Sequence, residues 1–430
     1  MNNVMLTRTL STLFLCPLAA AVLVAQPAQT PTDLAKKALD LMLQKKYTDL
    51  KPLFTPAYRD NATPEKLALL APKAEWGAVK STGDPAVTDM GPIKKVTIPL
   101  KFENGDYEFV LFVNPSGEIG QLGFAPAPAV WQPPPYAKAG ACADRNVTVG
   151  EGDWKLPGVV SLPIGGGPFP AVVLVHGTGK RDRDETAFAN KVFKDLAVGL
   201  CSRGIASVRY DKRILRYAAK MDGSQYTVDE DITDDAVQAA ALLRMQKEVD
   251  PNKVYLLGYE MGGYVAPRIV EADGKIAGVV LFAANERPLE DLFLDQAIAT
   301  QKPQKYLDGI RNAVSEIKHL DPGDNDRPPK LGFPISYWVD LRSYNAGALM
   351  KSFTGPILVL QPERDFQVPM TDFEGWKAAL AGRTNVTFKS YPGLNHIFIQ
   401  SEGKNSDDDY RKSSHVSPEV IDDLVKFLSH

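Results

Sequence analysis

Residues 253–263 read Lys-Val-Tyr-Leu-Leu-Gly-Tyr-Glu-Met-Gly-Gly, and they carry the strongest indication of the chain's architecture. The run Lys253–Leu257 is short, apolar and followed by a glycine, which is typical of a strand buried on both faces. A glycine-rich turn then carries Glu260 directly into Gly262–Glu271, which we expect to be a helix. A buried strand that turns sharply into a helix indicates a sheet with helices packed on it.

The same alternation of strand and helix continues on both sides of this stretch. Short β-branched runs separated by helical stretches predict an α/β fold, with a mostly parallel sheet and helices on both of its faces. The other expected strands are Ala171–Val175, Ile205–Arg209, Ile276–Phe282, Pro356–Leu360 and Val386–Tyr391, and the other expected helices are Phe188–Arg203 and Asp229–Gln246.

Polar motifs follow four of these strands, at the edge of the sheet where ligands bind in such folds. His176-Gly177-Thr178-Gly179 follows the first strand, and Gly258–Gly263 follows the third. Gln361–Asp365 and Pro392–His396 follow the last two. In chain order, the four motifs supply a glycine-containing loop, a tight turn before a helix, an acid and a histidine.

These motifs and their order resemble the α/β-hydrolase fold, in which a nucleophile, an acid and a histidine follow one another along the chain. Arg183-Asp184-Glu185 and Tyr210–Arg213 extend the resemblance to exported esterase-like proteins related to dienelactone hydrolases. The resemblance covers roughly residues 145–430, within an expected hydrolase domain at 141–430. It implies a helical cap, which we expect in the insertion at about 285–350, where it would form the apolar wall of the substrate pocket.

One position departs from this family. Its elbow is Gly-x-Ser-x-Gly, and here Glu260 stands where the serine belongs. A glutamate, with a usual pKa of ~4.3, is already ionised at neutral pH and needs no base to activate it. The resemblance then leaves His396, oriented by Asp365, to activate water. It also implies an oxyanion hole formed by the backbone N–H groups of Thr178 and Met261.

Several roles are open to Glu260. Its carboxylate could attack an ester carbonyl to give an anhydride, or could serve as the base for a water molecule. It could also attack a saturated carbon and form a covalent ester, as an Asp does in dehalogenases and epoxide hydrolases of this fold. A buried Glu260 beside His396 could instead form a structural ion pair. We therefore expect a hydrolase of small esters or related electrophiles, with an epoxide or halide hydrolase and a catalytically inactive binding protein as alternatives.

The N-terminal residues 1–25 have the pattern of a secretory signal peptide. Arg8 supplies the positive charge, Leu10–Val24 is apolar, and Ala25 precedes a plausible cleavage point. The strongly apolar stretch is shorter than the ~20 residues of a membrane-spanning helix. We therefore expect an exported protein, periplasmic or extracellular, that has no membrane span once the signal is cleaved.

Residues 30–125 predict a small α+β domain before the hydrolase domain. Helical spacing in Pro31–Leu53 comes before two alternating strands, and Glu103–Asp106 has the composition of a hairpin turn between them. This order resembles the cystatin-like domains that precede some exported bacterial hydrolases. The proline-rich segment 126–140 is expected to be a semi-rigid linker.

Composition and charge argue against several other classes. A net charge of −3 does not favour nucleic-acid binding. The histidines show no metal-ligand spacing, so we expect no metal and no cofactor, and we expect a small-molecule substrate as the partner. Cys142 and Cys201 remain after signal cleavage. Because Cys201 lies in a buried helical stretch, we expect both thiols to stay reduced.

Overall fold

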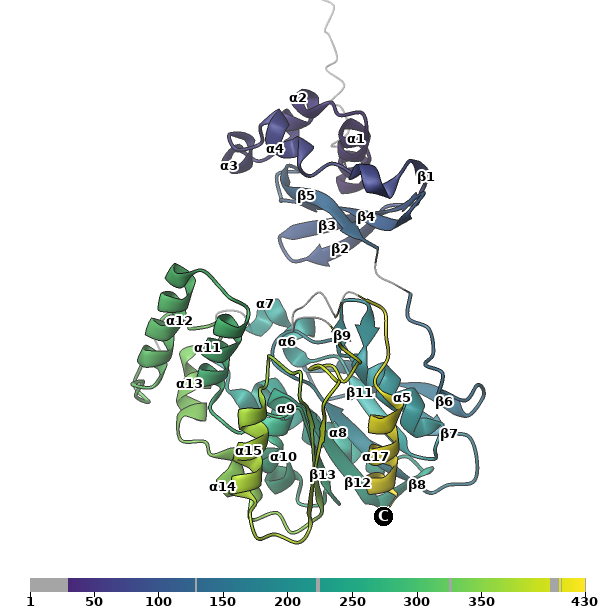
Figure 1. Cartoon of the computed structure of the whole chain (residues 1–430), viewed down its shortest axis with the longest axis vertical. Helices are drawn as coiled ribbons and strands as arrows, with labels where there is room; N and C mark the ends of the chain where they lie inside the picture. Colours follow the sequence, from purple (N-terminus) through teal and green to yellow (C-terminus); the bar gives the residue numbers. More distant parts are fainter. Residues whose placement is uncertain are drawn as a thin grey trace, which may run out of the picture. The chain divides into compact units, whose positions relative to one another are not determined.

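A computed structural model describes residues 30–127, 130–221, 225–324, 327–402, 410 and 412–429 of the 430-residue chain. The chain divides into two compact units, Met1–Ala127 and Pro128–His430, which are drawn in Figure 1. The expected signal peptide at 1–25 lies outside the described residues, so its assignment stays a prediction. Within the described part of the chain, no helix has the length and apolar character needed to cross a membrane.

The N-terminal unit packs a helical layer on an antiparallel sheet. Its long helix α1 (Pro31–Leu43) buries one apolar face, and the alternating apolar residues of β3 and β4 complete the same core. The hairpin between β3 and β4 turns where Phe102 pairs with Gly105. The remaining elements are α2 (Tyr47–Leu50), α3 (Pro56–Arg59), α4 (Pro64–Ala68), β1 (Val79–Thr82), β2 (Ala86–Met90), β3 (Ile93–Phe102), β4 (Gly105–Val113) and β5 (Ile119–Pro126).

The C-terminal unit is built on an eight-stranded sheet with the order β15-β14-β13-β12-β8-β11-β7-β6. Strands β11 to β15 and β8 run parallel, whereas β6 and β7 are antiparallel and form one edge. The strands are β6 (Cys142–Val149), β7 (Leu156–Pro163), β8 (Phe169–Val175), β11 (Ala206–Tyr210), β12 (Val249–Tyr259), β13 (Val279–Phe282), β14 (Ile357–Pro362) and β15 (Val386–Tyr391), with a small separate pair β9 (Thr186–Ala187) and β10 (Asn190–Lys191).

Helices cover both faces of this sheet (Figure 1). Successive residues of β8 point to opposite sides, so Val173 enters the core under α8 and α10 whereas Val172 and Leu174 enter the core under α5 and α17. The predicted α/β-hydrolase fold is therefore confirmed. The helices around the sheet are α5 (Val192–Cys201), α6 (Arg213–Arg216), α7 (Ala218–Met221), a π-helix (Asp229–Thr233), α8 (Asp234–Arg244), α9 (Met261–Tyr264), α10 (Ala266–Asp273), α15 (Met370–Ala379) and α17 (Pro418–Leu428).

The segment between β13 and β14 is helical, in the region where we expected a cap. It contains α11 (Leu289–Ala299), α12 (Gln304–Ile317), α13 (Ile335–Arg342) and α14 (Ala346–Met350). Phe333, Tyr337, Trp338 and Tyr344 of this segment are buried in the core with α8 and α10, and the Tyr344 hydroxyl donates a hydrogen bond to the Tyr264 carbonyl at 2.8 Å. These aromatic side chains thus fix the cap segment to the elbow helices.

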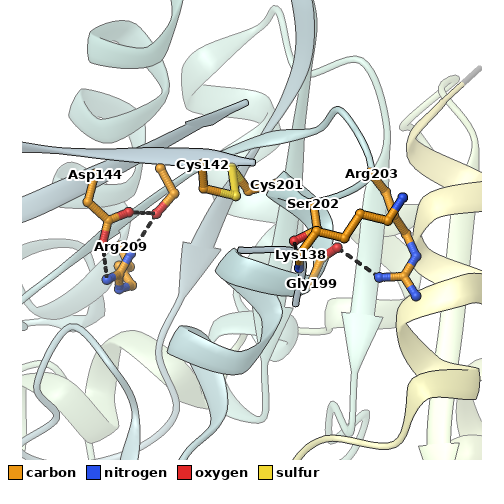
Figure 2. The surroundings of a disulfide bond; sticks show 9 residues. Lys138, Cys142, Asp144, Gly199, Cys201, Ser202, Arg203 and Arg209 are labelled. Atoms are coloured by element: carbon orange, nitrogen blue, oxygen red, sulfur yellow. Dashed lines mark hydrogen bonds and ion pairs between the residues drawn. A yellow bond between two sulfur atoms is a disulfide. The ribbon is translucent and has the colours of Figure 1, made fainter. Parts of the chain in front are cut away.

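Cys142 and Cys201 form a disulfide, so our expectation of two reduced thiols is wrong. Figure 2 shows Cys142 at the start of β6 meeting Cys201 at the end of α5, with a Cα–Cα distance of 5.8 Å. The backbone N–H of Lys138 also donates to Ser202 Oγ at 2.9 Å, which holds the chain before β6 against the end of α5. Burial of Cys201 did not prevent pairing because the edge strand brings its partner to it.

Part of the expected linker also packs on the C-terminal unit. The Trp131 indole N–H donates to Asp195 of α5 at 2.8 Å, and the ammonium group of Lys194 lies 4.1 Å from the centre of the Trp131 ring. Because these partners lie more than 60 residues further along the chain, the proline-rich composition alone gave no sign of this contact.

Candidate active site

The turn that carries Glu260 has the close contacts of an elbow. Glu260 has φ 50° and ψ −113°, a conformation that is rare for a residue with a side chain. The turn needs glycines because a Cβ at Gly258 would lie 2.3 Å from the Gly262 carbonyl oxygen, and one at Gly262 would lie 2.5 Å from that of Val175. The backbone thus holds Glu260 in a strained position at the carboxyl end of β12, ahead of α9.

The Glu260 carboxylate lies against the loop that follows β8. It is buried, and its Oε2 accepts a hydrogen bond from the backbone N–H of Thr178 at 3.1 Å. A Cβ at Gly177 would come within 2.3 Å of the same oxygen, so the loop can close on the carboxylate only with glycine there. Met261, the second residue assigned to the oxyanion hole, is fully buried at the start of α9. The Glu260 carboxylate thus accepts the hydrogen bond from Thr178 N–H that we predicted for a substrate oxyanion.

His396 and Asp365 form a buried hydrogen-bonded pair. His396 Nδ1 and Asp365 Oδ2 are 2.7 Å apart, and Asp365 Oδ1 accepts the backbone N–H groups of Gln367 and Val368 at 2.8 and 2.9 Å. Burial lowers the pKa of His396, but the charge and hydrogen bond of Asp365, together with the charge of Glu260, raise it above its usual value overall. With Nδ1 engaged by Asp365, Nε2 is the nitrogen left to exchange protons with water or substrate.

The structure brings the predicted site residues to one edge of the sheet. They follow β8, β12, β14 and β15, which belong to a run of five adjacent strands. The ring centroids of Tyr259 and His396 lie 4.9 Å apart, and the charge of Glu260 contributes to the raised pKa of His396. Glu260 therefore lies within electrostatic range of the His396–Asp365 pair.

The sequence interpretation missed a second ion pair at this edge. Arg181 Nε lies 3.1 Å from Glu185 Oε1 and also donates to the Thr178 carbonyl at 2.9 Å, so it stabilises the same loop. Glu185 is buried, and burial raises its pKa to about 7. Both residues and His396 line a cavity of about 330 Å³. The Arg183-Asp184-Glu185 motif marked this loop in the sequence, but nothing there distinguished Glu185 from its neighbours.

The neighbouring charged motif residues have structural partners. Arg183 pairs with Asp211 at 2.9 Å, and Arg209 pairs with Asp184 at 3.0 Å. The Lys212 ammonium group donates to the Gly177 carbonyl at 3.1 Å and pairs with the buried Asp231 of the π-helix. Of these contacts, the hydrogen bond from Lys212 holds the loop that follows β8, in which the backbone N–H of Thr178 donates to Glu260.

His176 begins the oxyanion loop and stays neutral. Burial, with the charges of Lys212 and Arg181, lowers its pKa to about 3. Its ring packs edge-on against Tyr210, with 5.0 Å between the centroids. A histidine that does not titrate near neutral pH and is packed among rings shapes the loop instead of exchanging protons. Within the described ranges, no three His, Cys, Asp or Glu side chains are grouped so that they could hold a metal ion.

Comparison with known proteins gives one extensive sequence match. Esterase EstD of Thermotoga maritima is 36% identical over 337 residues, which make up 76% of this chain and 78% of EstD. No family model matches the chain. Among solved structures, Est1E from Butyrivibrio proteoclasticus is 13% identical, with a TM-score of 0.43 over 66% of this chain and 97% of its own. An esterase from Pyrococcus furiosus is 15% identical, with a TM-score of 0.41 over 63% and 88% of the two chains. The extent and identity of the EstD match show that this α/β-hydrolase belongs to the family of esterase EstD.

Proposed function

We propose that the protein is an exported hydrolase of small esters and related electrophiles. In this proposal Glu260 acts in place of the serine nucleophile, His396 activates water, and Asp365 orients His396. Membership of the EstD family supports ester hydrolysis, and the buried His396–Asp365 pair supports water activation beside the elbow.

The hydrogen bond from Thr178 N–H to Glu260 Oε2 carries this proposal. When Oε1 attacks the electrophilic carbon of a substrate, Oε2 becomes the carbonyl oxygen of the covalent intermediate. Water that loses a proton to His396 then attacks Cδ of Glu260, and negative charge develops on Oε2. Thr178 N–H already points at that atom, so the oxyanion hole stabilises the tetrahedral state without rearrangement. Collapse of that state expels the product, and an alkoxide takes its proton from protonated His396. Glu260 is left as a carboxylic acid, which loses its proton to solvent and becomes the carboxylate again.

The two possible substrates differ in their leaving groups. With an ester, attack at the carbonyl carbon expels an alcohol, which takes its proton from His396 in its protonated form, and leaves an acyl group on Glu260 as an anhydride. With an epoxide, attack at the saturated carbon opens the ring, and the alkoxide takes a proton from protonated His396. With a haloalkane, the attack expels a halide ion. Both reactions leave an alkyl ester on Glu260. The geometry gives the second reaction specific support, because its substrate has no carbonyl oxygen that must compete with Oε2 for Thr178.

Activity of the wild type, Glu260→Gln and Glu260→Ser on one panel of esters, epoxides and haloalkanes tests the proposal. We expect turnover by the wild type and loss of at least about 1,000-fold in Glu260→Gln, since the amide is a poor nucleophile. Recovery of ester hydrolysis in Glu260→Ser would indicate that the rest of the machinery is intact. No turnover by the wild type on any substrate, with ligand binding unchanged in Glu260→Gln, would favour an inactive binding protein.

Oxygen isotope labelling separates the roles of Glu260. After many turnovers in H₂¹⁸O, attack of water at Cδ predicts label in the Glu260 carboxylate, detected by mass spectrometry of the peptide. A single turnover should then give product without label from the water. If Glu260 is only a base, the first turnover gives labelled product and Glu260 stays unlabelled.

The export part of the proposal has separate support. The N-terminal pattern is that of a signal peptide, and the Cys142–Cys201 disulfide suits an oxidising compartment. Mass spectrometry of the protein recovered from periplasm and medium should give an N-terminus at Gln26. Recovery of the chain only from the cytoplasm, with residues 1–25 attached, would contradict export.

A further inference from the structure

A cavity of about 700 Å³ lies on the α10 side of the hydrolase unit, away from the catalytic residues. Its walls come from the π-helix, the start of α8, α10, and the chain that leads from Ser343 into α14. α10 contacts both the π-helix and α14 (Figure 1). Among the described residues, none lines both this cavity and the one that contains His396. The proposed hydrolase site therefore does not account for this cavity, whose volume is usual for a small-ligand pocket.

Three carboxylates line this cavity. Glu271 of α10 is exposed and forms no ion pair within the described structure. Asp234 begins α8 and lies 3.9 Å from Arg213, which Asp235 holds more closely at 2.6 Å. Burial and the charge of Asp229, the third carboxylate, raise the pKa of Asp234 against the effect of Arg213. The negative charge of this wall is thus incompletely compensated.

The cationic residue in the wall, Arg268, is engaged by partners of its own. Its Nη1 lies 2.8 Å from Asp340 Oδ2 and 3.6 Å from Asp229 Oδ1, and its guanidinium lies over the Tyr344 ring, 4.6 Å from the ring centre. Arg268 therefore leaves Asp234 and Glu271 to a cation from outside. Because no three acidic, His or Cys side chains of the described chain are grouped to hold a metal ion, an organic cation fits these carboxylates better.

A buried hydroxyl in the wall lacks a partner. Thr233 ends the π-helix, is 5% exposed and lines the cavity. In the part of the chain that the structure describes, its Oγ1 takes part in no hydrogen bond. A buried hydroxyl without a partner is unfavourable, and π-helical turns are frequent at functional sites. Thr233 is thus a second indication, independent of the carboxylates, that a polar ligand group belongs beside the π-helix.

Apolar side chains lie next to the carboxylates. Ala272 of α10 lines the cavity together with Tyr344, Ala348 and Leu349. Methylene groups can pack on such a surface while charged ends stay with polar partners. Since Asp234 and Glu271 lie on different helices, two ammonium groups joined by a short alkyl chain match this wall better than a single ammonium group.

We propose that this cavity binds a linear alkyl diamine, with its ammonium groups at Asp234 and Glu271 and its methylene chain on Ala348 and Leu349. The ammonium group beside the π-helix also donates a hydrogen bond to Thr233 Oγ1. This inference goes beyond the proposed hydrolase function and does not depend on it, because the cavity is lined by other residues.

Isothermal titration calorimetry of the full chain with 1,5-diaminopentane, at neutral pH and low salt, tests the inference. We expect saturable binding at one site, at least about fivefold tighter than that of 1-aminopentane, since the second ammonium group gains charged hydrogen bonds. The uncharged 1,5-pentanediol should show no detectable binding. Absence of saturable diamine binding, or equal binding of all three compounds, would overturn the inference.

Glu271→Gln removes one of the two carboxylates with little change in shape. Glu151→Gln is the matched control, because Glu151 is an exposed glutamate of the same unit outside the cavity lining. We expect Glu271→Gln to weaken diamine binding at least about fivefold, to the level of the monoamine, and Glu151→Gln to change it by less than about twofold. An equal effect of the two substitutions would indicate general attraction to an acidic surface and would overturn the inference.

Ala348→Trp fills the cavity from α14, and Ala378→Trp is its control, since both alanines are exposed and helical but Ala378 lies outside the lining. Ala348→Trp should abolish diamine binding and Ala378→Trp should leave it unchanged, with circular dichroism to verify folding. Unchanged binding in folded Ala348→Trp would place the diamine elsewhere and reject the cavity. Glu260→Gln should bind the diamine as the wild type does, so failure of the proposed hydrolase function would leave this result intact.

Discussion

The backbone N–H of Thr178 donates a hydrogen bond of 3.1 Å to Glu260 Oε2. The Glu260 carboxylate therefore accepts the hydrogen bond that an oxyanion hole would otherwise donate to its substrate. A serine in this turn would leave that N–H free for a substrate carbonyl. With Glu260, the charge that the hole stabilises lies on the enzyme's own side chain. The loop that follows β8 therefore acts on the nucleophile itself in the mechanism proposed above.

Gly177→Ala should disturb this contact directly. An added Cβ would lie 2.3 Å from Glu260 Oε2, so either the loop or the carboxylate must move. We expect the free energy of unfolding to fall by about 1–3 kcal/mol from overpacking, and kcat/KM to fall by about 100-fold from misplacement of the carboxylate. Urea unfolding and ester kinetics measure the two effects.

Two controls make this prediction specific to Glu260. A Cβ at Gly166 meets no atom within 4 Å, so Gly166→Ala should leave stability and activity unchanged. In a Glu260→Ser background the crowded oxygen is absent, so Gly177→Ala should cost much less stability there. An equal loss of stability in both backgrounds would show that the clash with Glu260 is not the cause.

Asp365→Asn should shift the pH dependence of activity toward acid and lower its maximum. Burial lowers the pKa of His396, whereas the charge and hydrogen bond of Asp365, with the charge of Glu260, raise it overall, and His396 must be neutral to accept a proton from water. At saturating substrate, hydrolysis of the covalent intermediate needs neutral His396, so kcat should rise with pH through a value above the usual histidine pKa where this step limits turnover. Without the charge, this acidic limb moves to lower pH, and misorientation of the ring lowers the maximum by about 100- to 10,000-fold. An unchanged pH profile in Asp365→Asn would contradict the assignment.

Much of the fold could be predicted because its central strands are buried on both faces. β8, Val254–Leu257 within β12 and Ile357–Leu360 within β14 appear in the sequence as uninterrupted apolar runs, which are typical of strands buried on both faces. Edge strand β6 was not predicted: most of its residues are exposed, so they lack an apolar pattern. Because β6 was not predicted, the Cys142–Cys201 disulfide was not predicted either. The bond depends on this edge strand lying beside the end of α5.

The site could be predicted only where a motif follows a strand. Glu260, Asp365 and His396 come directly after strands, which limits their possible positions to one edge of the sheet. Their chemical roles stay predictions. Arg181 and Glu185 belong to a loop whose path depends on tertiary burial, and Glu185 has a φ of +48° that no local pattern indicates. The position of Gln367 likewise depends on hydrogen bonds with Tyr410 and Gln296, which are distant from it in sequence.

Glu185 should make the hydrolase unit less stable as the pH rises. Burial raises its pKa from the usual value of 4.5 to about 7, so between these values the native state binds more protons than the unfolded state. Stability from this group is present at low pH and is lost as the pH rises through about 7. The wild-type free energy of unfolding should thus fall by about 2–3 kcal/mol relative to Glu185→Gln between pH 5 and pH 8. Urea unfolding at several pH values measures it, and parallel curves for the two proteins would contradict it.

Loss of the Cys142–Cys201 disulfide should destabilise the C-terminal unit without changing its active site. The bond closes a loop with a sequence separation of 59, for which chain entropy predicts about 4 kcal/mol of stabilisation, with smaller values common in practice. We therefore expect the double variant Cys142→Ala, Cys201→Ala to unfold at lower urea concentration, with a loss of about 2–4 kcal/mol and unchanged kcat/KM. Dithiothreitol should lower the stability of the wild type by a similar amount and leave the double variant unaffected. If reduction does not alter the wild-type unfolding curve, the bond does not restrain the unfolded chain as proposed.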